Sequence, residues 1–70
     1  MNFNILNPAI AEHYKAVDLA IKRLVDMHND DYDIGDREIF NSVLARYGLL
    51  EDGFCSEEAY IIQEVSKRIR

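Results

Sequence analysis

The sequence contains one cysteine, one proline, three glycines and no tryptophan, and it lacks the run of about 18 apolar residues that a membrane helix needs. The lone Cys55 cannot form a disulfide within the chain, which is typical of a reducing compartment. So few glycines and prolines cannot supply the turns of a many-stranded β fold. The first residues also lack the basic stretch and apolar run of a signal peptide. We therefore expect a cytoplasmic, mainly helical protein.

The length and composition predict a single domain over residues 1–70. Apolar residues make up 49% of the chain and charged residues 30%, a balance that favours a folded globule over a disordered chain. A chain this short buries only a small core, so we expect its net stability to be modest.

The net charge of −5 is concentrated in one segment. Residues 26–38 hold six acids and one base, Arg37, so this segment alone sums to −5. The rest of the chain has seven acids and seven bases and sums to zero. The six acids, called the acidic patch below, are Asp26, Asp30, Asp31, Asp33, Asp36 and Glu38. Such a localised charge can steer a molecule toward a basic surface.

Residues from about 8 to 28 carry the pattern of an amphipathic helix, with Asn7 as the N-cap and Pro8 at the first helical position. Apolar residues recur at steps of four and three, which places them on one stripe of the helix. They are Ile10, Tyr14, Val17, Ile21 and Leu24. We expect this stripe to face the core. Residues 29–36 are rich in turn-forming Asn, Asp and Gly and are predicted to form a loop.

Two shorter helices are predicted at about 37–47 and about 57–70, with Asp36 and Ser56 as their N-caps. Gly48 is expected to end the first of them in a left-handed conformation. Their buried faces are predicted to be Ile39, Phe40, Val43, Leu44 and Tyr47 in the first and Ile61, Ile62, Val65 and Ile69 in the second.

The connection between these two helices, residues 49–55, contains an Asp-Gly turn, and we expect its Leu50 and Phe54 to plug the core. Residues 1–6 alternate in part and are predicted to form a short extended N-terminal arm. The fold predicted from these elements is an all-α, compact three-helix domain with that arm at its start.

The sequence offers no complete catalytic or metal site. Aligning Gly35 with the glycine of a calcium-binding EF-hand loop leaves three ligand positions without a suitable side chain. His13 and His28 do not have the spacing of metal ligands. Cys55 lies at a predicted helix start, where the pKa of a thiol can be lowered, but the sequence places no base beside it. We predict that the protein is not an enzyme and has no catalytic residues, no metal and no cofactor.

Direct nucleic-acid binding is not expected either. The last two helices have the order of a helix-turn-helix, but their connection is longer than the tight turn of that motif. Nucleic-acid binders usually carry a basic face, whereas here only Lys67, Arg68 and Arg70 cluster, as cations often do at the C-terminus of a helix. We also expect no membrane partner.

Two apolar residues break the helical pattern and are candidates for partner contacts. Leu19 lies opposite the apolar stripe of the first helix, and Tyr60 lies on the far side of the last helix from its apolar face. Single exposed apolar residues are common, but aromatic and aliphatic anchors also centre many interfaces. Phe3 and Ile5 in the arm have no evident partner within three helices. These four residues are the predicted partner-binding positions, and a homodimer could cover all of them.

The function predicted by elimination is a non-enzymatic protein-binding module: a small cytoplasmic regulator or inhibitor that occupies a partner's surface. The acidic patch would speed association, and the apolar anchors would supply affinity. Two alternatives stay open. The acidic patch could mimic a nucleic acid and block a DNA- or RNA-binding protein, or the chain could be a purely structural homodimer subunit. The composition is typical of small stand-alone regulators, including phage- or plasmid-type accessory proteins.

Overall fold

The computed structural model describes residues 8–69, which contain three α-helices and no β-strand. The helices are α1 (Pro8–Asn29), α2 (Arg37–Arg46) and α3 (Glu58–Arg68). The predicted all-α three-helix fold is therefore confirmed. The arm predicted for residues 1–6 lies outside the described residues.

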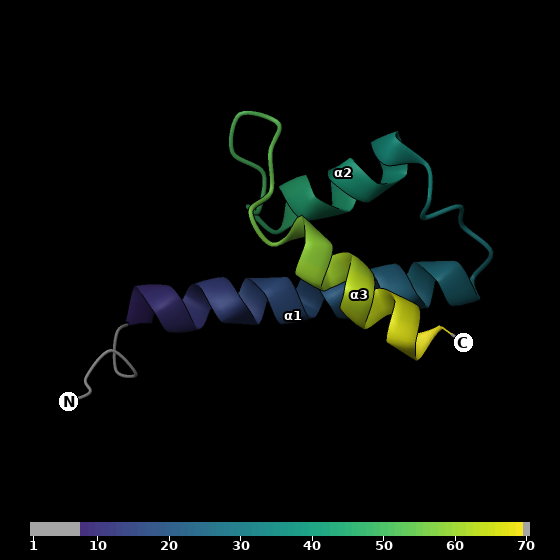
Figure 1. The fold of residues 1–70 in the computed structure, drawn as a ribbon, viewed down its shortest axis with the longest axis horizontal. Helices are drawn as coiled ribbons and strands as arrows, with labels where there is room; N and C mark the ends of the chain where they lie inside the picture. Colours follow the sequence, from purple (N-terminus) through teal and green to yellow (C-terminus); the bar gives the residue numbers. More distant parts are fainter. Residues whose placement is uncertain (1–7, 70) are drawn as a thin grey trace.

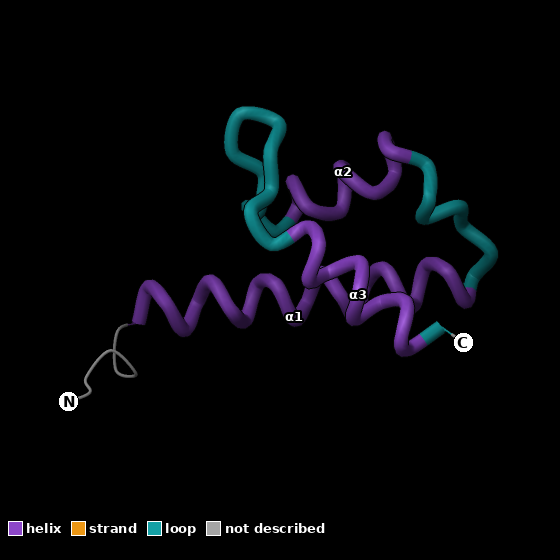
Figure 2. Tube along the Cα trace, viewed as in Figure 1, coloured by secondary structure: helices purple, strands orange, loops and turns teal. Residues whose placement is uncertain are grey.

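Helices α2 and α3 both pack against α1, whereas their own backbones stay apart within the described chain. The chain runs along α1, turns back through α2 and turns again into α3, which crosses α1 obliquely (Figure 1). The two connections lie at opposite ends of α2 (Figure 2). Because α1 is the one helix that contacts both others, it carries the centre of the core.

The core consists of apolar side chains from all three helices and from the second connection. Its members are Val17, Ala20, Ile21, Leu24, Phe40, Val43, Leu44, Leu49, Cys55, Ile61 and Val65. Each of these residues has less than a tenth of its surface exposed. Removing this apolar surface from water is the main force that holds the three helices together.

The first turns of α1 extend past this core, which corrects the prediction that Ile10 and Tyr14 are buried. They are 43% and 66% exposed, although they share a stripe with the buried Val17 and Ile21. The reason is length. At about 1.5 Å per residue, the 22 residues of α1 span about 33 Å, whereas the 10 residues of α2 and the 11 of α3 span only about 15 Å each. The short helices cannot cover the whole stripe.

Two other residues predicted to be buried are exposed. Phe54 does not plug the core: it is 67% exposed, while Leu50 packs partly buried against the core as expected. Phe54 pairs with Glu51 across the Asp-Gly turn, and this small hairpin holds it away from the helices. Ile62 is 46% exposed because it lies on the side of α3 that faces α2, whose backbone does not approach closely enough to cover it.

The predicted ends of α2 are confirmed. The carboxylate of Asp36 accepts hydrogen bonds from the backbone N–H groups of Glu38 and Ile39, at 2.9 and 3.3 Å. Gly48 has a φ of 70°, and the N–H of Leu49 donates to the carbonyl of Leu44 at 2.9 Å. This is the Schellman arrangement, in which a left-handed residue lets the chain satisfy the last free carbonyls of a helix.

The other two helix ends differ in detail from the prediction. Helix α1 ends at Asn29 in the same Schellman arrangement, but the left-handed position is taken by Asp31, with a φ of 69°. Helix α3 begins at Glu58, and the residue at its cap position is Glu57 instead of the predicted Ser56. Glu57 makes no capping hydrogen bond because its carboxylate bonds to His13 of α1, at 2.8 Å.

Candidate protein-binding surfaces

The predicted partner-binding residues do not form one site in the described part of the chain. Leu19 and Tyr60 are both exposed, as the helical pattern predicted. Leu19 lies on α1, on the face opposite the core, and Tyr60 lies on α3, so they are separate positions on two helices. Phe3 and Ile5 fall outside the described residues.

A different apolar surface forms where α1 extends past the core. The His13 ring packs edge-on against Tyr14, with 6.0 Å between the centroids, and bonds to Glu57 at the start of α3. A hollow of about 280 Å³ lies between His13 and Phe54 of the hairpin, and its lining is mainly polar, with Glu51, Ser56 and Glu57 contributing to it. The surface made by Ile10, His13, Tyr14 and Phe54 is called the end surface below. Its two aromatic side chains come from segments about forty residues apart (14 and 54), so no local pattern could have predicted it.

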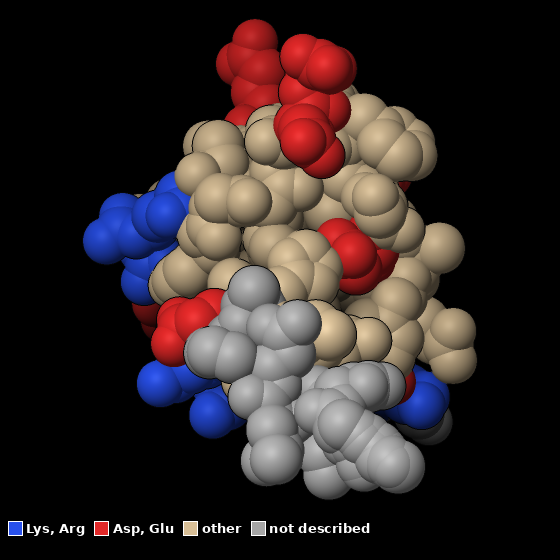
Figure 3. Space-filling view, turned by 90° about the vertical axis from the view of Figure 1, so that its left-hand side faces the viewer, with Lys and Arg blue, Asp and Glu red and all other residues tan. Residues whose placement is uncertain are grey.

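Figure 3 views the molecule from the end at which α1 begins. Much of the visible surface belongs to residues other than Lys, Arg, Asp and Glu, with an acidic side chain in its middle, further acidic side chains above it, and both basic and acidic ones at its sides.

A second hollow, called the α2–α3 groove below, lies between the helices whose backbones stay apart. It has a volume of about 240 Å³. Phe40 lines it from α2, and Ile62, Val65 and Ile69 line it from the α3 side. Ile34, in the loop before α2, lies at its border. The groove exists because the backbones of α2 and α3 stay apart: Phe40 and Val65 at its base are buried, whereas Ile62 and Ile69 stay partly exposed.

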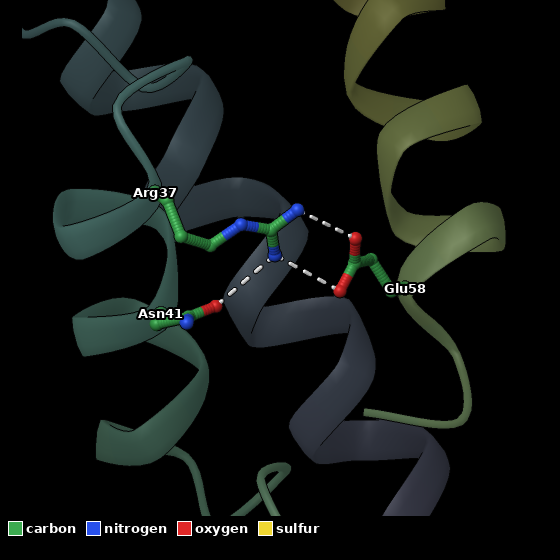
Figure 4. A network of polar contacts seen from close by, with 3 residues as sticks. All are labelled: Arg37, Asn41 and Glu58. Atoms are coloured by element: carbon green, nitrogen blue, oxygen red, sulfur yellow. Dashed lines mark hydrogen bonds and ion pairs between the residues drawn. The ribbon is translucent and has the colours of Figure 1, made fainter. Parts of the chain in front are cut away.

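Arg37 crosses the border of this groove and joins α2 to α3 (Figure 4). Its guanidinium donates to both carboxylate oxygens of Glu58, at 3.1 and 3.0 Å, and to the side-chain oxygen of Asn41 at 3.3 Å. It also stacks over Phe40, 5.5 Å from the ring centroid. The hydrogen bonds and charge of Arg37 hold the pKa of Glu58 below its ordinary value, and those of Glu58 raise the pKa of Arg37. Nothing in the local sequence pairs these residues, because they lie 21 positions apart on different helices.

All six members of the acidic patch are exposed. Two of their carboxylates also bond to the backbone. Asp36 caps α2, and Asp33 accepts a hydrogen bond from the N–H of Gly35 at 3.1 Å. Asp33 and Asp36 thus stabilise the local backbone through these hydrogen bonds, while the carboxylates of the whole patch stay exposed to solvent.

Cys55 is 2% exposed, and its burial raises the pKa of its thiol. The lower pKa considered for this position from the sequence is therefore wrong: loss of hydration disfavours the thiolate. The carboxylate of Glu57 lies next to the thiol, with Oε1 3.8 Å from Sγ, and its negative charge acts in the same direction. Among residues 8–69, no group of three or more His, Cys, Asp or Glu side chains is placed to hold a metal ion.

No protein family, curated protein or solved structure matches the chain. None of the described helices is long and apolar enough to cross a membrane. The function is therefore inferred from the end surface, the α2–α3 groove and the acidic patch.

Proposed function

We propose that the protein is a non-enzymatic protein-binding module, a small regulator or inhibitor that acts by occupying a partner's surface. The observation that supports this proposal is the end surface. The apolar stripe of α1 continues beyond the core, so Ile10 and Tyr14 expose the kind of face that Val17 and Ile21 bury.

A partner that covers this surface would extend the existing core along α1. Burying one fully exposed large apolar side chain contributes about 1.5–3 kcal/mol, and the partly exposed Ile10, Tyr14 and Phe54 would each contribute a part of this to a contact. Tyrosine is also enriched among the residues that dominate binding energy, because it buries a large area and loses little conformational freedom. The partner we expect presents a complementary apolar patch.

The test is affinity capture with the immobilised protein, comparing wild type with Tyr14→Lys. Tyr32→Lys is the matched control, since Tyr32 is also an exposed tyrosine but lies in the loop after α1. We expect a stoichiometric partner that Tyr14→Lys loses and Tyr32→Lys retains, at both low and high salt. A partner lost with Leu19→Lys or Tyr60→Lys instead would move the interface to the residues predicted from the helical pattern. Retention by all four variants would reject the end surface.

Exposure of all six carboxylates favours a second candidate, mimicry of a nucleic acid. In that case the captured partner would be a DNA- or RNA-binding protein, it would dissociate as salt is raised, and free nucleic acid would compete for it. The acids lie on one segment and do not cover an extended face, which makes this the weaker candidate.

Sedimentation equilibrium distinguishes a homodimer from both of these proposed functions. If the end surface pairs with a second copy, wild type dimerises and Tyr14→Lys is monomeric. If Leu19 mediates the pairing, Leu19→Lys is the monomeric variant, because residues 14 and 19 lie on nearly opposite sides of α1.

A further inference from the structure

We propose that the α2–α3 groove binds a basic amphipathic helix of a partner protein, with apolar side chains in the groove and lysine or arginine side chains over the neighbouring acidic patch. This inference adds a second contact to the proposed function. It rests on residues separate from those of the end surface, so an experiment can reject the groove contact without rejecting the end-surface contact, and the reverse.

The size and lining of the groove favour a protein side chain as its occupant. Its volume of about 240 Å³ is below the 300–1,000 Å³ that is usual for small-molecule and cofactor pockets. Its walls are the aromatic ring of Phe40 and the aliphatic side chains of Ile62, Val65 and Ile69. A groove of this shape between two helices suits the apolar face of a third helix, which places one or two large side chains in it.

The charges around the groove specify a basic partner. Ile34 and Gly35 line one border, and the exposed carboxylates of Asp33 and Asp36 flank them directly in the chain. The cation at this border, Arg37, is compensated by its two hydrogen bonds to Glu58 and does not oppose an incoming positive charge.

The two cations Lys67 and Arg68 of α3 share one carboxylate, that of Glu64, so their charge is compensated in part. The ammonium of Lys67 lies 3.1 Å from the Glu64 carboxylate, and the guanidinium of Arg68 lies 3.5 Å from it. The acids of the segment 26–38, which sums to −5 with Arg37 included, therefore outnumber the cations on this side of the chain. A helix with lysine or arginine beside its apolar stripe complements both features at once.

The test uses an 18-residue synthetic helix with leucine on one face and lysine on the other, fluorescently labelled and titrated by anisotropy at two salt concentrations. A matched peptide carries glutamate in place of lysine. We expect the lysine peptide to bind at least about tenfold more tightly than the glutamate peptide, with a difference that shrinks as salt is raised. Equal binding of the two peptides, or no binding of either, would overturn the proposal.

Two matched pairs of variants locate the contact. Ile62→Ser should weaken lysine-peptide binding about tenfold, whereas Ile10→Ser should not, although the two isoleucines are 46% and 43% exposed. Asp33→Asn should weaken binding about threefold and flatten its salt dependence. Asp52→Asn in the distant hairpin removes the same charge and should have no effect.

Circular dichroism is the control for folding. We expect each variant to be folded, because all four positions are exposed. Loss of binding with Ile10→Ser and not with Ile62→Ser would assign the peptide to the end surface and reject the groove. Dimerisation of wild type that Ile62→Ser abolishes would also overturn the proposal, since a second copy would then be the occupant.

Discussion

The guanidinium of Arg37 and the carboxylate of Glu58 form a two-point bridge, with N–O distances of 3.1 and 3.0 Å, between two helices whose backbones do not pack against each other. The bridge joins the first residue of α2 to the first residue of α3 (Figure 4). It adds a direct polar link between α2 and α3, which are otherwise held in place by their packing on α1.

The first prediction concerns the pH dependence of stability. The folded-state pKa of Glu58 lies below its ordinary value of 4.5, so the bridge stabilises the fold above about that pH and is lost as the pH falls through the folded-state pKa. We expect Glu58→Gln to lower the Tm at pH 7 and to lower it progressively less as the pH falls below 4.5. The measurement is thermal unfolding by circular dichroism across this range.

Glu12→Gln is the control for this prediction, because it removes an exposed carboxylate of α1 that takes no part in the bridge. Arg37→Gln combined with Glu58→Gln should be no less stable than Arg37→Gln alone, since Arg37→Gln already breaks the contact with Glu58. An equal loss of Tm at pH 3 and pH 7 would show that Glu58 acts through packing and not through its charge.

The second prediction concerns the end of α1. Asp31 has a φ of 69°, a conformation that strains most residues and suits glycine. We expect Asp31→Gly to stabilise the protein by ~0.5–1 kcal/mol, which would raise the Tm by about 2–8 °C. Asp30→Gly removes the same charge next to it without relieving a positive φ, and should be neutral or destabilising. Similar gains from both variants would assign the effect to charge at the helix C-terminus.

The third prediction compares two adjacent isoleucines of α3. Ile61 is fully buried, whereas Ile62 lines the α2–α3 groove and is half exposed. Ile61→Ala should lower the free energy of unfolding by about 2–5 kcal/mol because it leaves a cavity, and Ile62→Ala should cost less than about 1 kcal/mol. Urea denaturation of both variants measures the difference. Comparable losses would mean that α2 covers Ile62 in solution and that the groove is closed.

The fourth prediction concerns the thiol of Cys55. Because it is buried and its pKa is raised, we expect a chromogenic disulfide reagent at pH 7.5 to modify the native protein far more slowly than the urea-unfolded chain. Core-destabilising Ile61→Ala should speed this reaction, since modification then follows opening of the fold. A native rate equal to the unfolded rate would place Cys55 at an accessible position.

Local signals in the sequence predicted the helices well because capping is a local interaction. Asp36 accepts hydrogen bonds from N–H groups only two and three residues further along the chain. Gly48 is itself the residue that adopts the left-handed conformation after α2. The same reasoning missed Asp31 as the left-handed residue after α1, because glycine is the usual signal there and aspartate is common in loops of every kind. It also predicted the exposure of Leu19 and Tyr60, since their angles on the helices alone exclude them from the core.

The sequence by itself determined which face of each helix is apolar, where each helix begins and ends to within a few residues, and that the excess charge runs from the end of α1 to the start of α2. Tertiary structure alone decided how much of each apolar face is covered. Ile10 and Tyr14 fit the core pattern yet stay exposed, because α1 is about twice as long as its neighbours. The Arg37–Glu58 bridge and the α2–α3 groove have no local signal, because periodicity records the direction of a side chain and not the distance to the element that faces it.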